Sequence, residues 1–363
     1  MTRHIAVFGK MGVKFAPIIA DTFNAQSNAQ SEKWVVDVWP CNDDLEARDA
    51  ILANCEAAVM SADFILTPGN FGALMAAPKL KILLQPWVGT DWLDAGFLPD
   101  GLLFCNAGGH AAPMAEYVLG AVLEHALELR HLHQDMTQGK WHRAGRNAAA
   151  EARHGDLRGK HVGIIGYGDI AKAVASRAHA FDMQVSAIAR SVRETTPAPL
   201  DWIGTQEDLP KLLGQSDYLI LTCDLNDETQ GMIDAAAFEA MKDSAYIINV
   251  ARGEVIEEDA LFDALSNRKI GGAAVDTWYR YPTNITDAEA DPDRGGPYQG
   301  SRHDFLSLDN VLLTPHSAAH TFGADRGRYE SIAKSLLSYA KGEPIKRHVT
   351  TGTGANLDGF QMP

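Results

Sequence analysis

The sequence predicts an α/β protein made of two domains, each a mainly parallel sheet with helices on both faces. Three observations support this fold class. The chain has 363 residues, which is long enough for two separate cores. Short apolar segments alternate with segments of helical periodicity almost throughout. A glycine-rich turn also joins an apolar segment to a helix near residue 166, as in doubly wound sheets.

The first domain is expected to start with a strand at the amino terminus. The apolar segments predict short buried strands at 5–8, 35–39, 64–67, 82–85 and 103–105. A helix is expected over 44–58, with Asp43 or Asp44 as the N-cap, because either carboxylate can accept a hydrogen bond from a free first-turn amide. A long helix over 112–133 follows, with Pro113 in its first turn.

The second domain contains six predicted strands, at 162–166, 184–188, 218–222, 245–249, 272–276 and 311–314. A long helix over 322–340 then returns the chain toward the first domain. The stretch 282–304, rich in Pro, Gly and Asp, interrupts the second domain, and so long a loop is usually functional or mobile. The tail 346–363 is expected either to be disordered or to lie across a partner subunit.

The glycine-rich turn predicts a dinucleotide site. Gly166 permits the tight turn, Gly168 lets the backbone approach a phosphate, and the small Ala171 lets the helix pack on the strand. The first amides of the helix point at the anion. The residues predicted to bind the pyrophosphate are therefore Gly166, Tyr167, Gly168, Asp169 and Ile170.

The segment after the second strand of this domain selects the nucleotide. An NAD site usually has an acidic residue there to bind the ribose 2′-hydroxyl. This chain has Arg190, Ser191 and Arg193 instead. Both arginines could bind a 2′-phosphate through charge-assisted hydrogen bonds, so NADP is the preferred cofactor, with NAD possible. The alternative is an ordinary solvated basic turn.

Composition excludes several classes of function. The net charge of −15 argues against nucleic acid or an anionic membrane as a partner, because either needs a concentrated basic surface. The amino-terminal apolar run is too short for a signal peptide, and nothing resembles a membrane span. The four cysteines form no C-x-x-C pair, which suits free thiols in a reducing compartment. A cytoplasmic protein is expected.

Two residues that follow predicted strands have the chemistry of a catalytic site. Arg252 ends a buried strand, where an open α/β sheet faces its ligand, and it could hold a carboxylate bidentately. The alternative is a surface arginine that pairs with Glu254 or Glu257. His316 follows the last strand after a proline and has a pKa suited to acid–base work, although a lone histidine is more often structural.

Short motifs in a fixed order resemble the D-2-hydroxyacid dehydrogenase family over nearly the whole chain. They are Trp87–Asp91, Ala115–Tyr117, Gly139–Trp141, the turn at 162–171, Ser216-Asp217, Glu228–Gly231, Asn249–Gly253, Ala274–Asp276 and Thr314–His316. The resemblance implies two Rossmann-like domains: a flavodoxin-like substrate domain (1–111 and 317–363) and an inserted doubly wound NAD(P)-binding domain (112–316). It also implies a homodimer, and hydride transfer between the nicotinamide and a small 2-hydroxy or 2-keto acid.

The resemblance also implies roles for individual residues. The backbone at Trp87, Val88 and Gly89 would bind the substrate carboxylate, and Arg252 would hold that carboxylate and polarise the reacting carbonyl. His316 would transfer the proton, and domain closure would exclude water. The cofactor would further contact Cys223, Val250, Ala251, Asp276 and His316.

Tyr281 departs from the family pattern. Typical members have an acidic residue at this position that pairs with the catalytic histidine, whereas formate dehydrogenases have a neutral glutamine. A phenol stabilises imidazolium far less than a carboxylate does, so His316 is expected to be neutral at lower pH, which favours oxidation of an alcohol. Alternatively, Arg280 or the 282–304 loop reshapes the pocket for a larger substrate. An aromatic lining of Trp87, Trp278, Tyr279 and Tyr281 would suit a bulky acid.

No metal site is expected. His131 and His133 do not share a helix face, and no cysteine or acidic partner completes a zinc pattern with them or with the nearby His125, His142 and His154. Two other functions remain open on this scaffold. One is a nucleotide-sensing protein like the C-terminal-binding corepressors, and the other is a formate-dehydrogenase-like enzyme.

Overall fold

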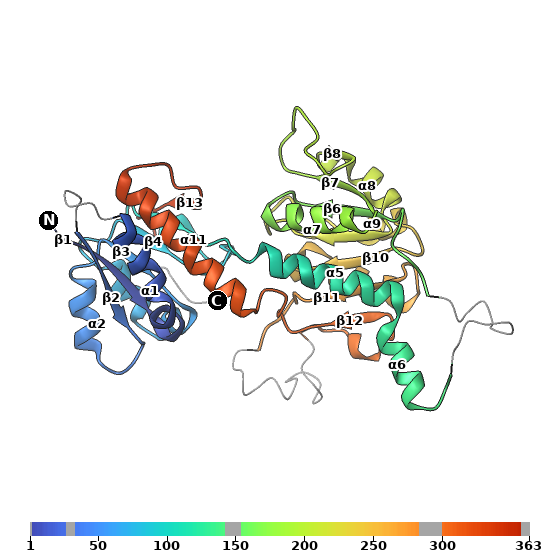
Figure 1. The fold of residues 1–363 in the computed structure, drawn as a ribbon, viewed down its shortest axis with the longest axis horizontal. Helices are drawn as coiled ribbons and strands as arrows, with labels where there is room; N and C mark the ends of the chain where they lie inside the picture. Colours follow the sequence, from blue (N-terminus) through green and yellow to red (C-terminus); the bar gives the residue numbers. More distant parts are fainter. Residues whose placement is uncertain (1, 27–32, 142–153, 283–299, 357–363) are drawn as a thin grey trace. The chain divides into compact units, whose positions relative to one another are not determined.

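The computed structural model describes residues 2–26, 33–141, 154–282 and 300–356 (Figure 1). The chain folds as two compact units. The first unit consists of Met1–His110 and Thr321–Pro363, and the second of Ala111–His320. Among the described residues, no helix is both long enough and apolar enough to cross a membrane.

The first unit contains a six-stranded sheet in the order β13-β5-β4-β3-β1-β2. Its strands are β1 (Thr2–Phe8), β2 (Lys33–Trp39), β3 (Ala57–Val59), β4 (Ile82–Leu84), β5 (Leu103–Cys105) and β13 (His348–Thr351). The first five are parallel, and their order 2-1-3-4-5 is the flavodoxin-like order. The helices of this unit are α1 (Gly9–Gln26), α2 (Leu45–Leu52), α3 (Ala62–Ile65), α4 (Asn70–Met75) and α11 (Phe322–Lys341).

Two predictions between residues 44 and 67 are wrong. The helix that Asp44 caps ends at Leu52, so that Ala57–Val59 form the buried strand β3. The predicted strand at 64–67 is the short helix α3, whose first turn is capped by Ser61. Periodicity cannot distinguish a short buried strand from a buried helical turn, and both segments are equally apolar. The N-cap role of Asp44 is confirmed, because its carboxylate accepts a hydrogen bond from the Ala47 amide at 3.0 Å.

The prediction that the carboxyl-terminal tail is disordered or lies across a partner subunit is also wrong for residues 348–351. These residues form β13, which pairs antiparallel with β5 of the same chain. The edge of β5 would otherwise present unpaired backbone groups, and β13 satisfies them. Residues 357–363 lie outside the described part of the chain.

The second unit contains a seven-stranded parallel sheet in the order β12-β11-β10-β9-β6-β7-β8. The strands are β6 (His161–Ile165), β7 (Gln184–Ile188), β8 (Trp202–Gly204), β9 (Tyr218–Leu221), β10 (Tyr246–Asn249), β11 (Gly272–Val275) and β12 (Val311–Leu313). Counted within the unit, the order contains the 3-2-1-4-5-6 arrangement of dinucleotide-binding sheets, with the switch point between β6 and β9. The sequence did not predict β8.

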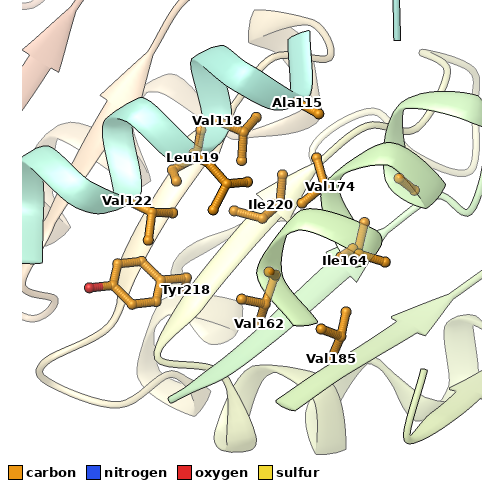
Figure 2. Packing of buried hydrophobic residues seen from close by; sticks show 14 of the residues in the cluster. Ala115, Val118, Leu119, Val122, Val162, Ile164, Val174, Val185, Tyr218 and Ile220 are labelled. Carbon is orange, nitrogen blue, oxygen red and sulfur yellow. The ribbon is translucent and has the colours of Figure 1, made fainter. Parts of the chain in front are cut away.

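Helices cover both faces of this sheet. They are α5 (Ala111–Leu127), α6 (Leu129–Thr137), α7 (Asp169–Ala180), α8 (Leu209–Gln215), α9 (Ala235–Ala240) and α10 (Glu258–Ser266). The predicted helix over 112–133 is two helices, because Glu128 adopts a left-handed conformation (φ 52°) that interrupts the first one. On one face, Val118 and Val122 of α5 pack with Val174 of α7 over Val162 and Ile220 of the sheet (Figure 2). The predicted fold class is confirmed.

Parallel pairing places the carboxyl ends of β6, β9, β10, β11 and β12 at one edge of this sheet. Ligands of open α/β sheets bind outside this edge at the switch point. The loop predicted at 282–304 also belongs to this unit, but residues 283–299 lie outside the described part of the chain.

Candidate active site

The turn after β6 is pressed against the end of β9. Gly166 has a φ of +89°, and a Cβ atom on it would lie 2.7 Å from the Cys223 Cα atom and 2.8 Å from the Cys223 nitrogen. The Thr222 hydroxyl donates to the Gly166 carbonyl at 2.8 Å and fixes the turn from the β9 side. Only glycine fits here. Thr222 was not predicted from the sequence, although its position directly after the strand β9 at the switch point could have indicated it.

The first turn of α7 is built to receive an anion. Gly168 is the N-cap, and no side chain caps the helix. A Cβ atom on Gly168 would meet nothing within 4 Å, so the backbone is open on that side. Ala171 is fully buried against the core and holds the helix close to the sheet. Uncapped amides at the start of a helix favour a phosphate, and these residues therefore fit a dinucleotide.

The basic segment after β7 is exposed and faces one acidic residue. The Arg190 guanidinium lies 3.8 Å from the Asp224 carboxylate, with side chains 70% and 80% exposed. The Arg193 guanidinium lies 5.4 Å from the centre of the Tyr167 ring. Ser191 is exposed as well. Tyr167 and the two arginines thus gather beside the glycine turn, and Asp224, interpreted from the sequence as a solvated or capping residue, is the exposed acidic neighbour of Arg190.

Cys223 also belongs to this edge, and it contributes through its backbone. Burial raises the pKa of its thiol to about 11, so the side chain stays neutral. Its backbone packs against Gly166, as described above.

Asp276 organises the turn that follows β12. Its side chain is 1% exposed, and its two oxygens accept hydrogen bonds from the Thr314 hydroxyl at 2.7 Å, the Ser317 amide at 2.8 Å and the Ala318 amide at 3.0 Å. Its carbonyl accepts from the His316 amide at 2.8 Å. His316 itself has a φ of +53°. The sequence suggested only a cofactor contact for Asp276, whereas the structure shows that it holds the His316 turn in place.

The Asp276→Ala substitution is expected to destabilise the protein by about 2–4 kcal/mol, because it removes the acceptor of one buried and two partly buried hydrogen bonds. Urea unfolding followed by circular dichroism measures this change. Asp243→Ala is the control, because Asp243 is exposed in the same unit and its carboxylate forms no hydrogen bond or ion pair with the described residues. Equal stability of Asp276→Ala and the wild type would show that the hydrogen bonds at Asp276 contribute nothing net.

Tyr281 is a close neighbour of His316. The two ring centres are 5.5 Å apart, and the His320 ring lies parallel to His316 at 6.5 Å. The Tyr281 oxygen accepts a hydrogen bond from the Trp278 amide at 3.1 Å. Although the tyrosine is 47% exposed, burial of its hydroxyl end raises its pKa, while that hydrogen bond and the Arg252 charge oppose the rise. A neutral phenol therefore stands beside His316.

Arg252 lies at the end of β10 in a turn that Asn249 stabilises. The Asn249 side chain donates to the Arg252 carbonyl at 2.8 Å and accepts from the Ala251 amide at 3.0 Å. The Arg252 guanidinium donates to the Ala251 carbonyl at 2.8 Å. Val250 and Ala251 are buried in this turn. Arg252 therefore extends from a rigid support at the same edge of the sheet as Asp276 and His316.

The expected aromatic lining is smaller than the sequence suggested. Trp278 packs in the core against Phe305, and its indole donates to the Thr314 carbonyl at 2.8 Å. Tyr279 is half-buried. Of the four aromatic residues, Tyr281 is exposed and Trp87 is half-buried against the core of the first unit.

In the first unit, side-chain amides donate hydrogen bonds to the backbone carbonyls of the loop after β4 and fix its conformation. The Gln85 amide donates to the carbonyls of Trp87 at 3.2 Å and Gly89 at 2.6 Å, and the Asn106 amide donates to that of Val88 at 2.9 Å. No described residue accepts a hydrogen bond from the amides of Val88 or Gly89. The loop thus offers two backbone donors. The sequence pattern did not indicate the supporting roles of Gln85 and Asn106.

The described residues contain no group of three histidine, cysteine, aspartate or glutamate side chains that could hold a metal ion. His131 lies 3.4 Å from Asp135 one helical turn later in α6. His142, part of the histidine-rich region, lies outside the described residues.

Comparison with known proteins gives a consistent result. Residues 119–318 match the family profile described as "D-isomer specific 2-hydroxyacid dehydrogenase, NAD binding domain". A D-3-phosphoglycerate dehydrogenase of Archaeoglobus fulgidus is 32% identical over 294 residues, 80% of this chain, which spans only about half (51%) of that relative. A hydroxypyruvate reductase of Thermotoga maritima is 32% identical over 253 residues, 69% of this chain and 74% of the relative.

Among solved structures, a D-2-hydroxyisocaproate dehydrogenase superposes with a TM-score of 0.71 at 23% identity. The match covers 96% of this chain and all of that one. At this identity the likeness concerns the fold.

Proposed function

The chain belongs to the D-isomer-specific 2-hydroxyacid dehydrogenase family, and on that basis we propose that it is a nicotinamide-dependent oxidoreductase that interconverts a 2-hydroxy acid and its 2-keto acid. One observation carries the proposal. Arg252, Asp276 and His316 lie at the same edge of the second unit's sheet as the glycine turn of Gly166. A carboxylate clamp, a proton carrier and a phosphate-binding turn together are what this reaction needs.

The second unit would bind the cofactor, with the pyrophosphate at the start of α7. The backbone at Cys223, Val250 and Ala251 would contact the rest of the cofactor. Asp276 would contact the nicotinamide end while it holds the turn after β12. When bound, the nicotinamide supplies or accepts the hydride. The first unit would act as the substrate domain.

The protein's own groups would perform three tasks. Arg252 would hold the substrate carboxylate and polarise the carbonyl oxygen, on which negative charge develops during reduction. The amides of Val88 and Gly89 would bind the same carboxylate. The His316 imidazolium would give its proton to that oxygen during reduction, and the neutral imidazole would take a proton from the hydroxyl during oxidation.

The neutral Tyr281 phenol points to a preferred direction. A phenol stabilises the His316 imidazolium less than a carboxylate would, so the neutral imidazole is favoured. Because the neutral form accepts a proton, oxidation of the hydroxy acid is favoured. The aromatic side chains of the half-buried Trp87 and the exposed Tyr281 would suit a bulky or aromatic acid. We also propose a cytoplasmic homodimer, which size-exclusion chromatography with light scattering would test.

NADP is the proposed cofactor, because Arg190 and Arg193 stand where a 2′-phosphate would bind. Arg190→Ala is expected to raise the dissociation constant for NADPH by about tenfold or more, since a charge-assisted hydrogen bond contributes about 1.5–3 kcal/mol, and to leave NADH binding nearly unchanged. Fluorescence titration with both nucleotides measures this. Equal weakening for the two would remove Arg190 from 2′-phosphate recognition.

Asp224→Asn is expected to have the opposite effect to Arg190→Ala. The Asp224 carboxylate lies beside Arg190 and would repel a 2′-phosphate. Its removal should therefore tighten NADPH binding and leave NADH binding unchanged.

The direct test of the function is oxidation of NADPH and NADH by the purified protein with glyoxylate, hydroxypyruvate, pyruvate and phenylpyruvate. Oxidation of the corresponding hydroxy acids with NADP at alkaline pH runs alongside. Turnover that His316→Ala abolishes would support the dehydrogenase. Tight nucleotide binding without turnover in either direction would instead favour the nucleotide-sensing protein, with Tyr281 as the reason.

A further inference from the structure

The first unit contains a cavity of about 630 Å³ that none of the residues Trp87–Gly89 lines. One face of α11 forms its longest wall, and the segments before α5 and β13 close it. The residues that line it are Gly109, Gly323, Arg326, Gly327, Glu330, Ser331, Lys334, Ser335, Ser338, Lys346 and Arg347. The volume falls within the range of pockets that bind small molecules.

The helix sequence builds this cavity through two stripes of residues four apart. One stripe has small side chains, which leave space for the cavity; it consists of Gly323, Gly327, Ser331 and Ser335. The adjacent stripe has longer or polar side chains; it consists of Arg326, Glu330, Lys334 and Ser338.

The floor of the cavity is a close backbone contact. A Cβ atom on Gly327 would lie 2.5 Å from the Gly109 carbonyl oxygen, so a larger residue would push the helix away. The Ser331 hydroxyl accepts a hydrogen bond from the Gly108 amide at 2.9 Å and fixes the same contact. The walls are therefore held rigidly by the fold.

The charge around the cavity is strongly positive in a chain whose net charge is −15. Four cations and one carboxylate line it. Arg326 pairs with that carboxylate, Glu330, at 2.9 Å. Among the described residues, neither Lys334 nor Lys346 has an ion-pair partner. Exposed lysines kept close together repel one another, and a bound anion would relieve that repulsion.

We propose that this cavity binds a small organic anion that carries two or more phosphate or carboxylate charges. Lys334, Lys346 and Arg347 supply the charge, and the hydroxyls of Ser335 and Ser338 supply additional hydrogen-bond donors. The residues that line the cavity belong to the first unit and the cofactor turn to the second, and the proposal does not depend on the proposed dehydrogenase activity. It includes Gly109 and Gly323, each within three residues of a point where the chain passes between the two units.

Isothermal titration of the full-length protein with pyrophosphate and with citrate tests the proposal. Saturating NADP is present, so that the turn at Gly166 is already filled. We expect one equivalent of anion per chain, much weaker binding of the monoanion acetate, and affinity that falls with added salt. Tighter binding of pyrophosphate would identify a phosphorylated ligand, and tighter binding of citrate a polycarboxylate.

The Lys334→Ala/Lys346→Ala double variant should weaken this binding by at least tenfold. Lys341→Ala is the matched control, because Lys341 ends the same helix and does not line the cavity. Circular dichroism and the melting temperature verify that all variants fold. The proposal is overturned if no anion binds, or if the control and the double variant bind the anion alike.

Discussion

Replacing Arg252 with alanine is expected to lower kcat/KM for a 2-keto acid by about two to three orders of magnitude. The guanidinium would stabilise the oxygen on which charge develops, and loss of such a donor costs about 3–4 kcal/mol of transition-state stabilisation. The turn that Asn249 braces should survive the substitution, since Asn249 bonds to the backbone of residues 251 and 252 and not to the arginine side chain. Steady-state kinetics with the preferred acid measure the effect.

Two further variants make this test specific. Arg252→Lys keeps the charge but loses the planar fork, so an intermediate activity is expected. Arg268→Ala is the control, because Arg268 forms an exposed ion pair with Asp309 in the same unit and should leave the rate unchanged. A normal rate for Arg252→Ala would exclude this arginine from the mechanism.

Replacing His316 with alanine should reduce kcat by about 10²- to 10⁴-fold in both directions, because a positioned acid–base group contributes that much. His320→Ala is the control, since its ring lies parallel to His316 at 6.5 Å and comes from the same segment. If both variants lose equal activity, the segment has a structural role and His316 is not the proton carrier.

Tyr281→Glu separates proton transfer from packing. A carboxylate beside His316 would favour the imidazolium, the form that donates its proton during reduction of a keto acid. The alkaline limb of the pH profile for reduction should therefore move to higher pH, and oxidation should require higher pH as well. Tyr281→Gln, which stays neutral, should not move either limb. An unchanged profile in Tyr281→Glu would show that residue 281 does not influence the proton carrier.

Much of the site could be predicted because parallel strands impose order on the residues that follow them. Gly166, Arg252 and His316 each come directly after an apolar segment, and the carboxyl ends of parallel strands meet at one edge. The position of each residue after its strand was therefore enough to group them. The family assignment rested on the same short motifs and is confirmed by the comparisons. The preference for NADP stays a prediction.

The supporting residues could not be predicted in the same way. Gln85, Asn106 and Thr222 act through hydrogen bonds to loop carbonyls, and nothing in their spacing distinguishes them from other polar residues. The structural role of Asp276 depends on a turn some forty residues later in the chain. Such partners are defined by contacts between distant segments.

The sequence by itself determined the alternation of strands and helices, the glycine turn and the chemistry at the strand ends, because these depend on local periodicity and residue type. Only the tertiary structure decided that 57–59 and not 64–67 is a strand, that 348–351 completes the first sheet, and that Asp224 faces Arg190. It also brought the basic residues of α11 and of 346–347 around one cavity. Each of these depends on which distant segments share a hydrogen-bonding edge or a buried face, and local sequence does not specify that.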